Sequence, residues 1–560
     1  MRKQNLLCPV KGRNNEDCGM KNMTGNGFKK ALCRILCCAW MLMTAFGASA
    51  EGNETGAGGT VSAAAAETGN NRVFYEIFVG SFSDSDGDGT GDIRGIINRL
   101  DYLNDGDPVS ENSLGVEGIW LTPVFSSPTY HKYDITDYYT VDPRFGTLDD
   151  LKELTEECHR RGMIVILDLP INHTGRENKW FKNFTNAHLL HNPGHRYYDW
   201  YTWLPADSKL PAGRHFMKLQ GTGEYYECNF SDDMPELNFD NPAVRQAVLD
   251  VAKFYLDLGV DGFRFDAAKY IYYGDHKRSA EFWQWFIGEL KQLKPDIYTV
   301  AEVWDSDGIT DVYESALNCF DFTVSQSGGL IASTAKQGDV NKYTAYVEGY
   351  ISKISALSPD ARYTPFIANH DTDRAAGYLT VASHHAGMAA NLYILGPGSP
   401  FIYYGEEIGL RGSRGGANTD ANRRLAMLWG DGDTVRDPVG TTYDASKQTP
   451  YSVSDLENTD GSILKYYRRL IGIRRANPEI AAGEYRALVI PGTKVGGFTS
   501  TLNGSSVTVI HNTTNNTVIV DLTAVPGACS ETLTAYIGEG EAALENGVLT
   551  ISSHTSAVIR

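Results

Sequence analysis

Cysteine is scarce in this chain, with nine in 560 residues, and five of the nine lie within the first 50 positions. The other four, Cys158, Cys228, Cys319 and Cys529, are widely scattered. Their spacing matches neither a metal-binding motif nor a disulfide framework of a small secreted domain. We therefore expect these four to be buried free thiols.

Long apolar runs are also missing. The most apolar stretch lies in residues 31–50, "ALCRILCCAWMLMTAFGASA", which follows Lys29 and Lys30 and ends in Ala-Ser-Ala. It is too short to span a bilayer comfortably, and a basic start, an apolar centre and an A-x-A end are typical of a secretory signal. We predict a signal peptide over residues 1–50, cleaved after Ala50. The mature protein is then expected outside the cell, without a membrane partner.

Basic residues are outnumbered, with 50 Lys and Arg against 69 Asp and Glu, a net charge of −19. Removal of residues 1–50 takes away eight basic and two acidic residues and leaves a net charge of −25. Such a balance argues against nucleic acid or an anionic membrane surface as a partner. An acidic, aromatic-rich secreted protein is compatible with a neutral polar ligand such as a carbohydrate.

Residues 51–71 are rich in Gly, Ala, Thr and Asn and predict a linker. From Arg72 onward, short β-branched and aromatic stretches alternate with amphipathic helical patterns, which predicts eight strand-then-helix units and a closed (β/α)8 TIM barrel. The predicted strands are 73–79, 118–121, 163–169, 262–266, 297–302, 320–324, 364–368 and 401–404.

The third and fourth predicted strands are too far apart for one ordinary unit, because a unit takes about 30 residues. The excess indicates a domain inserted after the third strand, and the short alternating strands near the C-terminus indicate a separate β-sandwich. The expected organisation is barrel over 72–173, inserted domain over 174–240, barrel again over 241–480, and β-sandwich over 484–560.

Polar residues follow several predicted strands at the end where barrel enzymes place their active sites. They occur in "DLPINH" (168–173), "GVDGFRFDAAKY" (259–270), "AEVW" (301–304) and "IANHDTDR" (367–374). These segments bring three carboxylates, two histidines and an arginine to one rim. Two carboxyl groups about 5–5.5 Å apart are what a retaining glycosidase needs, one as nucleophile and one as acid and base.

These four motifs, in this order, resemble those of the α-amylase family of glycoside hydrolases (family 13). The resemblance extends from Arg72 to Arg560 and implies an inserted domain B and a C-terminal domain C. "MPELN" at 234–238 is similar to the motif of an intermediate group between oligo-1,6-glucosidases and neopullulanases that contains α-amylases. Glu236 departs from that motif, which puts a second calcium site between the barrel and domain B in doubt.

The resemblance implies that Asp266 is the nucleophile, Glu302 the general acid and base, and Asp371 the residue that binds sugar hydroxyls and stabilises the transition state. Arg264 lies two residues before Asp266 on the same strand face and should keep that carboxylate ionised, while nearby anions should raise the pKa of Glu302. Asp168 is expected to support Arg264. The substrate-binding residues that the resemblance implies are Tyr133, His173, Arg264, Lys269 and His370.

The stretch "SDSDGDGTGDIRG" (83–95) has the alternating acids of an EF-hand loop but carries Gly95 where the twelfth-position Glu would stand, and it follows a strand. A calcium sensor is therefore excluded. The stretch resembles instead the structural calcium loop of many family members. The implied Ca²⁺ ligands are Asp84, Asp86, Asp88, the carbonyl of Thr90, and Asp92.

Ala267 and the pair Val303-Trp304 stand where α-1,6-acting relatives tend to carry Val and "MPG", which favours α-1,4 cleavage. We expect a secreted, monomeric, calcium-stabilised, retaining α-amylase that acts on starch-type glucans and maltooligosaccharides. The alternatives are an exo-acting α-glucosidase or maltogenic enzyme, and a transglycosylase. A non-catalytic glucan-binding protein is disfavoured, because all three carboxylates are present.

Overall fold

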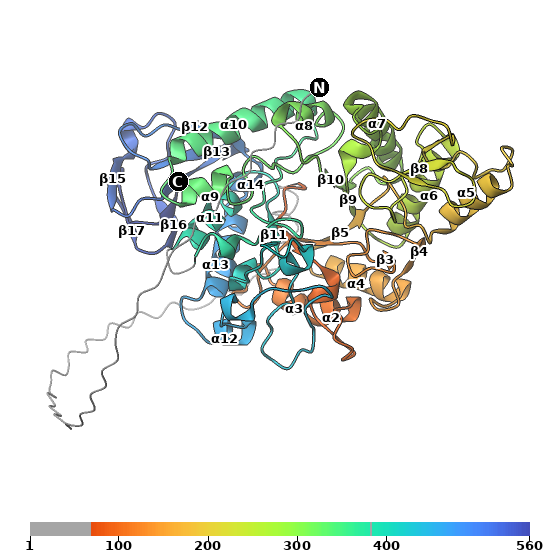
Figure 1. Ribbon diagram of the computed structural model, residues 1–560. Coiled ribbons are helices and arrows are strands. Elements are labelled where there is room, and N and C mark those ends of the chain that lie inside the picture. The colour runs from red at the N-terminus through yellow and green to blue at the C-terminus, as the bar shows by residue number, and fades with distance from the viewer. Residues whose placement is uncertain (1–68, 381–383) are drawn as a thin grey trace, which may run out of the picture. The chain divides into compact units, whose positions relative to one another are not determined.

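The computed structural model describes residues 69–380 and 384–560 (Figure 1). The predicted signal segment and most of the predicted linker lie outside these residues. Among the described helices, none combines the length and the apolar character needed to cross a membrane.

A parallel sheet forms the centre of the first part of the chain. Its strands follow the order β10-β9-β5-β2-β1-β11, and every neighbouring pair is parallel. Isolated parallel bridges from Ala301 to Cys319, from Phe320 to Thr364 and from Phe366 to Phe401 connect the two edge strands. The strands are β1 (Phe74–Ile77), β2 (Gly118–Leu121), β5 (Ile164–Leu169), β9 (Gly262–Phe265), β10 (Tyr298–Ala301) and β11 (Phe401–Tyr403).

These bridges confirm the predicted (β/α)8 barrel, with the sixth and seventh positions occupied by the segments around residues 320 and 365. The predicted strands 320–324 and 364–368 are reduced there to single bridges. The other six predicted strands are present: β2 has the predicted bounds, and the remaining five are one to three residues shorter than expected.

The barrel interior is filled by large side chains from successive strands, as expected for this fold. One buried cluster unites Phe74, Trp120, Ile166, Tyr298, Val300, Phe320, Phe366 and Phe401. Gly118 makes room for this packing, because a Cβ at that position would lie 2.5 Å from the ring of Phe74.

The same inward-facing rows continue into polar residues at the carboxyl ends of the strands. Side chains two residues apart on a strand face the same side. Asp168 therefore follows Ile166 in the interior row of β5, and Glu302 follows Val300 at the end of β10. The register pairs Asp168 with Arg264 of β9. The alternation of side-chain direction that places the core residues inside the barrel therefore also brings these polar residues together.

Helices surround the barrel, and several of them are amphipathic. In α4, the Thr147 side chain accepts a hydrogen bond from the Asp150 amide, and the Asp150 carboxylate accepts one from the Thr147 amide, a capping box that starts the helix. Leu151, Leu154 and Cys158 of the same helix are buried. The helices are α2 (Ile93–Asn98), α3 (Leu100–Leu103), α4 (Leu148–Arg160), α6 (Pro242–Asp257), α7 (His276–Leu293), α8 (Asp307–Tyr313), α9 (Leu330–Ala335), α10 (Val340–Leu357), α11 (His385–Ile394), α12 (Val453–Glu457), α13 (Ile463–Arg475) and α14 (Pro478–Ala482).

Two smaller units interrupt the βα repeat. A short hairpin of β3 (Phe125–Ser126) and β4 (Asp137–Val141) follows β2. Between β5 and β9 lie helix α5 (Lys179–Leu189) and an antiparallel sheet of β6 (Trp203–Leu204), β8 (Tyr225–Glu227) and β7 (Phe216–Lys218). In this insertion Trp200 and Tyr201 are buried, and Tyr201 packs edge-on against Phe181. These aromatic residues form a small core within the insertion.

The C-terminal residues form two antiparallel sheets, drawn in blue in Figure 1, which is consistent with the predicted β-sandwich. A separate apolar cluster that includes Ile510, Leu549 and Ile559 joins strands of both sheets. Helix α10 packs against β12 and β13. The strands are β12 (Glu484–Leu488), β13 (Gly496–Leu502), β14 (Ser505–Asn512), β19 (Thr555–Ile559) and β16 (Leu533–Gly538) in one sheet, and β15 (Val518–Asp521), β18 (Val548–Ile551) and β17 (Ala542–Glu545) in the other.

Candidate active site

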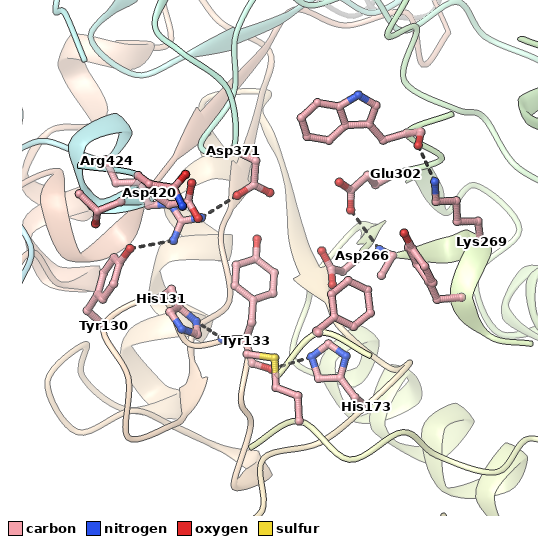
Figure 2. Close-up of a pocket in the computed structure, with 17 residues that line it drawn as sticks. Tyr130, His131, Tyr133, His173, Asp266, Lys269, Glu302, Asp371, Asp420 and Arg424 are labelled. Atoms are coloured by element: carbon pink, nitrogen blue, oxygen red, sulfur yellow. Dashed lines mark hydrogen bonds and ion pairs between the residues drawn. The ribbon is translucent and has the colours of Figure 1, made fainter. Parts of the chain in front are cut away.

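A cavity of about 640 Å³ opens at the carboxyl ends of the barrel strands. Figure 2 shows Asp266, Glu302 and Asp371 arranged around one opening. Six residues predicted from the sequence line this cavity: Tyr133, His173, Asp266, Lys269, Glu302 and Asp371. The two other predicted site residues, Arg264 and His370, are fully buried and are not part of its lining.

Arg264 holds the carboxylates from beneath. Its Nη1 lies 2.9 Å from Asp168 Oδ1 and 2.5 Å from Asp266 Oδ1, and its Nη2 lies 3.0 Å from Glu302 Oε2. A planar guanidinium presents its donors in a fixed fork, so one side chain fixes three carboxylates in relation to each other. The structure therefore assigns Arg264 to the support of the acids, whereas we expected it to contact the substrate. Asp168 supports Arg264 as predicted.

The backbone after β9 turns sharply at the residue that follows Asp266. Ala267 has a φ of +50°, an uncommon conformation for a residue with a side chain and one that tends to occur at functional sites. This turn directs the Ala267 amide toward Glu302, and the amide donates a hydrogen bond of 3.1 Å to Glu302 Oε2. The strained turn thus helps to fix the distance between the two carboxyl groups.

The pKa values of both carboxyl groups are raised. Burial is the largest cause for Asp266, whose pKa rises to about 6; Arg264 opposes the rise, and Asp168 and Asp371 add to it. Burial is also the largest cause for Glu302, whose pKa rises to about 7 with help from Asp266 and Asp371 and against Arg264. Arg264 thus acts in the predicted direction on Asp266, but burial outweighs it. The anions around Glu302 contribute as predicted, yet less than burial.

Asp371 is held between two cationic groups. Its Oδ2 lies 3.0 Å from His370 Nε2, and its Oδ1 lies 2.6 Å from Arg424 Nη2. His370 Nδ1 in turn lies 2.6 Å from Glu76 Oε1 on β1. Burial alone would lower the pKa of His370, but Asp371 and Glu76 raise it to about 10. Although burial raises the pKa of Asp371, the cations His370 and Arg424 hold it well below its usual range.

Replacement of Glu76 tests whether this buried pair holds Asp371 in place. Glu76→Gln removes the charge that faces His370 but keeps the shape, so we expect the free energy of unfolding to fall by about 1–3 kcal/mol. Because a less cationic His370 holds Asp371 more weakly, kcat should fall as well. Urea unfolding and steady-state kinetics measure both effects. Glu156→Gln, on the exposed side of α4, is the matched control and should change neither. Equal stability and kcat in Glu76→Gln and wild type would contradict this role.

The other predicted binding residues lie on different walls of the cavity. The hydroxyl of Tyr133 donates a 2.9 Å hydrogen bond to Asp168 and lies 2.6 Å from His370 Nε2, and its ring stacks on His370. His173 Nε2 lies 3.2 Å from the carbonyl oxygen of Tyr133. Lys269 Nζ donates to the Trp304 carbonyl at 2.6 Å and to Asp305 at 2.8 Å. These contacts hold each side chain at the cavity wall.

The cavity also contains residues that were not predicted as site residues. Trp304 stacks on Phe322 with their ring centroids 5.0 Å apart and keeps 40% of its surface exposed. Its position two residues after Glu302 was a usable signal. Phe230 comes from the insertion, and Arg424 lies 53 residues beyond Asp371, so no spacing in the sequence connects them with the site. The remaining cavity-lining residues that were not predicted are Tyr130, His131, Met234, Ala267, Tyr270, Asn418, Thr419 and Asp420.

The acidic loop after β1 brings only some of its predicted calcium ligands together. One carboxylate oxygen each of Asp84, Asp86 and Asp88 lies within 4.8 Å of the others. Asp92 instead caps α2: its Oδ1 accepts from the Gly95 amide at 2.6 Å and its Oδ2 from the Ser85 amide at 2.8 Å. The structure therefore places Asp92 in a capping role outside that group. Three clustered carboxylates are the oxygen donors that Ca²⁺ prefers, so this part of the loop fits the ion.

A parallel barrel that holds Asp266 and Glu302 on one guanidinium at the carboxyl ends of its strands provides the pair of carboxyl groups that a retaining glycosidase uses. A family model described as "Alpha amylase, catalytic domain" matches residues 76–483. The chain therefore belongs to the α-amylase family, glycoside hydrolase family 13, which includes hydrolases and transferases.

Individual relatives agree with this assignment. "Alpha-amylase 3" of Dictyoglomus thermophilum is 34% identical over 457 residues, which cover 79% of this chain and 84% of that protein. An oligo-1,6-glucosidase of Parageobacillus thermoglucosidasius is 31% identical over 530 residues, which cover 80% and 91%. Among solved structures, Amy13B of Eubacterium rectale superimposes with a TM-score of 0.79 at 32% identity and covers 88% of this chain and 95% of that one.

Proposed function

We propose that this protein is a retaining α-amylase that hydrolyses the α-1,4-glucosidic bonds of starch-type glucans and maltooligosaccharides. The observation that carries the proposal is the shared contact of Asp266 and Glu302 with one guanidinium, because it holds two carboxyl groups of raised pKa side by side in one cavity. When one of the two ionises, its charge favours the protonated form of the other, so that one can react ionised and the other protonated.

The reaction proceeds in two displacements. Glu302 donates its proton to the glycosidic oxygen while an ionised oxygen of Asp266 attacks C1, which breaks the C1–O bond and forms a covalent β-glycosyl-enzyme. Glu302, now a carboxylate, takes a proton from water as the water attacks C1, and Asp266 leaves. Two inversions give net retention of the α-configuration. Asp371, kept ionised by His370 and Arg424, accepts hydrogen bonds from sugar hydroxyls and stabilises the positive charge at C1.

We further propose that the enzyme is secreted. Support comes from the basic, apolar and A-x-A segments within residues 1–50, which lie outside the described residues. Expression of the full chain in a secretion-competent host, followed by N-terminal sequencing of the protein in the medium, tests this point. We expect the sequence to begin at Glu51. Full-length chain retained inside the cells would contradict it.

A product time course on amylose, maltotriose and panose tests the activity. An endo-acting α-amylase releases maltooligosaccharides of mixed length from amylose at early times. Glucose or maltose alone, with amylose barely degraded, would establish instead the exo-acting alternative. Panose contains one α-1,6 bond, so its cleavage at that bond would contradict the proposed α-1,4 preference. Products longer than maltotriose formed from maltotriose would establish a transglycosylase.

We also propose a structural Ca²⁺ at Asp84, Asp86 and Asp88. The ion would neutralise carboxylates that otherwise repel each other. Gly87 and Gly89, with φ of +86° and +93°, allow the chain to wrap tightly at this point. No step of the reaction involves this loop, so its expected contribution is to stability.

Asp88→Ala tests the metal proposal through the melting temperature. Wild type should melt several degrees lower after chelation and recover when Ca²⁺ is added, because an ion that binds only the folded state stabilises it. Asp88→Ala should melt at the chelated temperature and gain little from Ca²⁺. Asp107→Ala, which removes an exposed acid from the loop after α3, should respond like wild type. A wild-type melting curve unmoved by chelation would refute the proposal.

A further inference from the structure

A second group of potential metal ligands lies in the insertion, outside the residues that carry out the reaction. His215 immediately precedes β7 and Cys228 immediately follows β8. Because Phe216 pairs with Glu227 in this antiparallel ladder, His215 and Cys228 stand opposite each other, and the Cys228 amide donates a 2.9 Å hydrogen bond to the His215 carbonyl. Backbone pairing thus fixes their separation.

Asp232 completes the group from the loop that follows β8. The hydroxyl of Tyr226 donates a 2.7 Å hydrogen bond to the Asp232 carbonyl and holds this loop against the sheet. His215 Nε2 lies 2.7 Å from Asp232 Oδ1. One ligand atom each of His215, Cys228 and Asp232 lies within 4.8 Å of the other two.

We propose that His215, Cys228 and Asp232 bind a divalent transition-metal ion of the zinc type. Imidazole nitrogen, thiolate sulfur and carboxylate oxygen are the donors that Zn²⁺ takes, whereas Ca²⁺ takes oxygen alone. Tetrahedral Zn²⁺ with bonds of about 2.0–2.3 Å places its ligand atoms about 3.3–3.8 Å apart, so small side-chain rotations bring this group into range. Cys228 loses its thiol proton to solvent as the metal–sulfur bond forms.

Access and coordination number agree with such a site. The side chains of His215 and Asp232 are 53% and 54% exposed, so an ion enters from solvent, while Cys228 is buried at the inner end. Cys228 forms no disulfide, so its sulfur is free to bind a metal ion. Three protein ligands leave the fourth position of the ion to water.

The site connects to the cavity through Phe230, which lies between Cys228 and Asp232 in sequence. The Phe230 ring packs 5.3 Å from His173 and 4.9 Å from Tyr270, and Phe230 lines the cavity. Because the ligands Cys228 and Asp232 flank Phe230 in the sequence, a bound metal ion would hold Phe230, and with it one wall of the active site, in place. The spacing of the cysteines gave no sign of this arrangement, because only one of its three ligands is a cysteine.

Cobalt is the probe of choice, because a thiolate bound to Co²⁺ gives a near-ultraviolet charge-transfer band that carboxylates do not give. Metal-stripped protein comprising residues 51–560, which lacks the five cysteines of the predicted signal segment, is titrated with Co²⁺, and Zn²⁺ is then added to displace it. We expect a band that saturates at one Co²⁺ per chain and disappears with Zn²⁺. The band should be lost in Cys228→Ala. His215→Ala should bind Co²⁺ at least tenfold more weakly than wild type does. Cys319→Ala removes another buried thiol and should keep the band, as should Asp88→Ala in the acidic loop.

A charge-transfer band that persists unchanged in Cys228→Ala would overturn the proposal, and so would the absence of any band in wild type. Either result would leave an exposed ion pair of His215 and Asp232 beside a plain buried thiol. His215→Ala guards against a folding artefact in Cys228→Ala, because His215 is largely exposed. Near-ultraviolet circular dichroism of each metal-free variant confirms that its tertiary structure is retained.

Discussion

An Asp266→Asn variant is expected to lose kcat on amylose by about 10⁴- to 10⁶-fold, the loss typical of removing a covalent nucleophile. The amide has no ionised oxygen to attack C1, so the covalent intermediate cannot form. The fold should survive, because the substitution preserves shape and the Ala267 amide and Glu302 remain in place. Melting temperature and kcat are measured on the same preparation. Asp257→Asn, which changes an exposed acid at the end of α6, should match wild type in both.

The stereochemistry of chemical rescue separates a nucleophile from an acid. In Asp266→Ala, azide can occupy the space of the lost carboxylate and attack C1 of α-maltosyl fluoride in a single inversion. The expected product is the β-maltosyl azide. If Asp266 acted as acid and base instead, azide would attack a covalent intermediate and give the α-azide. Nuclear magnetic resonance of the product distinguishes the two, and the α-azide would refute the assigned role.

The central part of the site could be predicted from the sequence, because side chains two residues apart on a β-strand point to the same face. Asp168 follows the interior residue Ile166 by two positions, and Arg264 and Asp266 differ by two as well. Inward orientation along a strand and placement at its carboxyl end therefore bring these residues together. The six regular strands were predictable too, because they are short, largely apolar stretches that are buried along almost their whole length. The burial that raises the pKa values of Asp266 and Glu302, by contrast, depends on surrounding elements and has no local pattern.

The features that could not be predicted lie in segments whose sequence lacks the regular spacing of a strand or a helix. Phe320 and Phe366 contribute single bridges rather than strands, because their neighbours turn away after one residue. Arg424 reaches Asp371 from a loop whose course no repeat dictates. Asp92 belongs to the alternating acids by sequence, but the start of α2 needs a side-chain acceptor for its free amides, and Asp92 fills that need. Spacing groups Asp92 with Asp84, whereas the hydrogen bonds of its carboxylate follow from the backbone at the start of α2.

The active site is built from two layers with different tasks. The upper layer, with Asp266, Glu302 and Asp371, faces the cavity. The lower layer, with Arg264 and His370, is fully buried and compensates the negative charge of the first. Without these cations three carboxylates could not remain close together in a buried cavity, because their mutual repulsion would protonate them. The positive charge is not shared equally among the carboxylates. Asp371 contacts two cationic groups, whereas Glu302 shares the guanidinium of Arg264 with Asp168 and Asp266.

Glu302→Gln is expected to lose about 10²- to 10⁴-fold in kcat/KM on amylose, the range typical of general acid catalysis, but far less on α-maltosyl fluoride. Fluoride leaves without a proton, so the first displacement no longer needs the acid. The second displacement still lacks its base, and fluoride release should show a burst followed by a slow phase. Glu281→Gln, an exposed acid on α7, should behave like wild type with both substrates.

The pH dependence of kcat/KM on amylose identifies the acid independently. Asp266 must be ionised, so activity should fall as the pH drops through about 6, the pKa of that group. Glu302 must be protonated, so activity should fall as the pH rises through about 7. In Glu302→Gln acting on α-maltosyl fluoride the alkaline limb should vanish, because no proton remains to be lost, while the acid limb should stay. Since the two carboxyl groups interact, the limbs belong to the pair. The acid limb should stay near its wild-type position, because Glu302 is protonated and uncharged where Asp266 titrates. An alkaline limb that persists in Glu302→Gln would mean that another group supplies the proton.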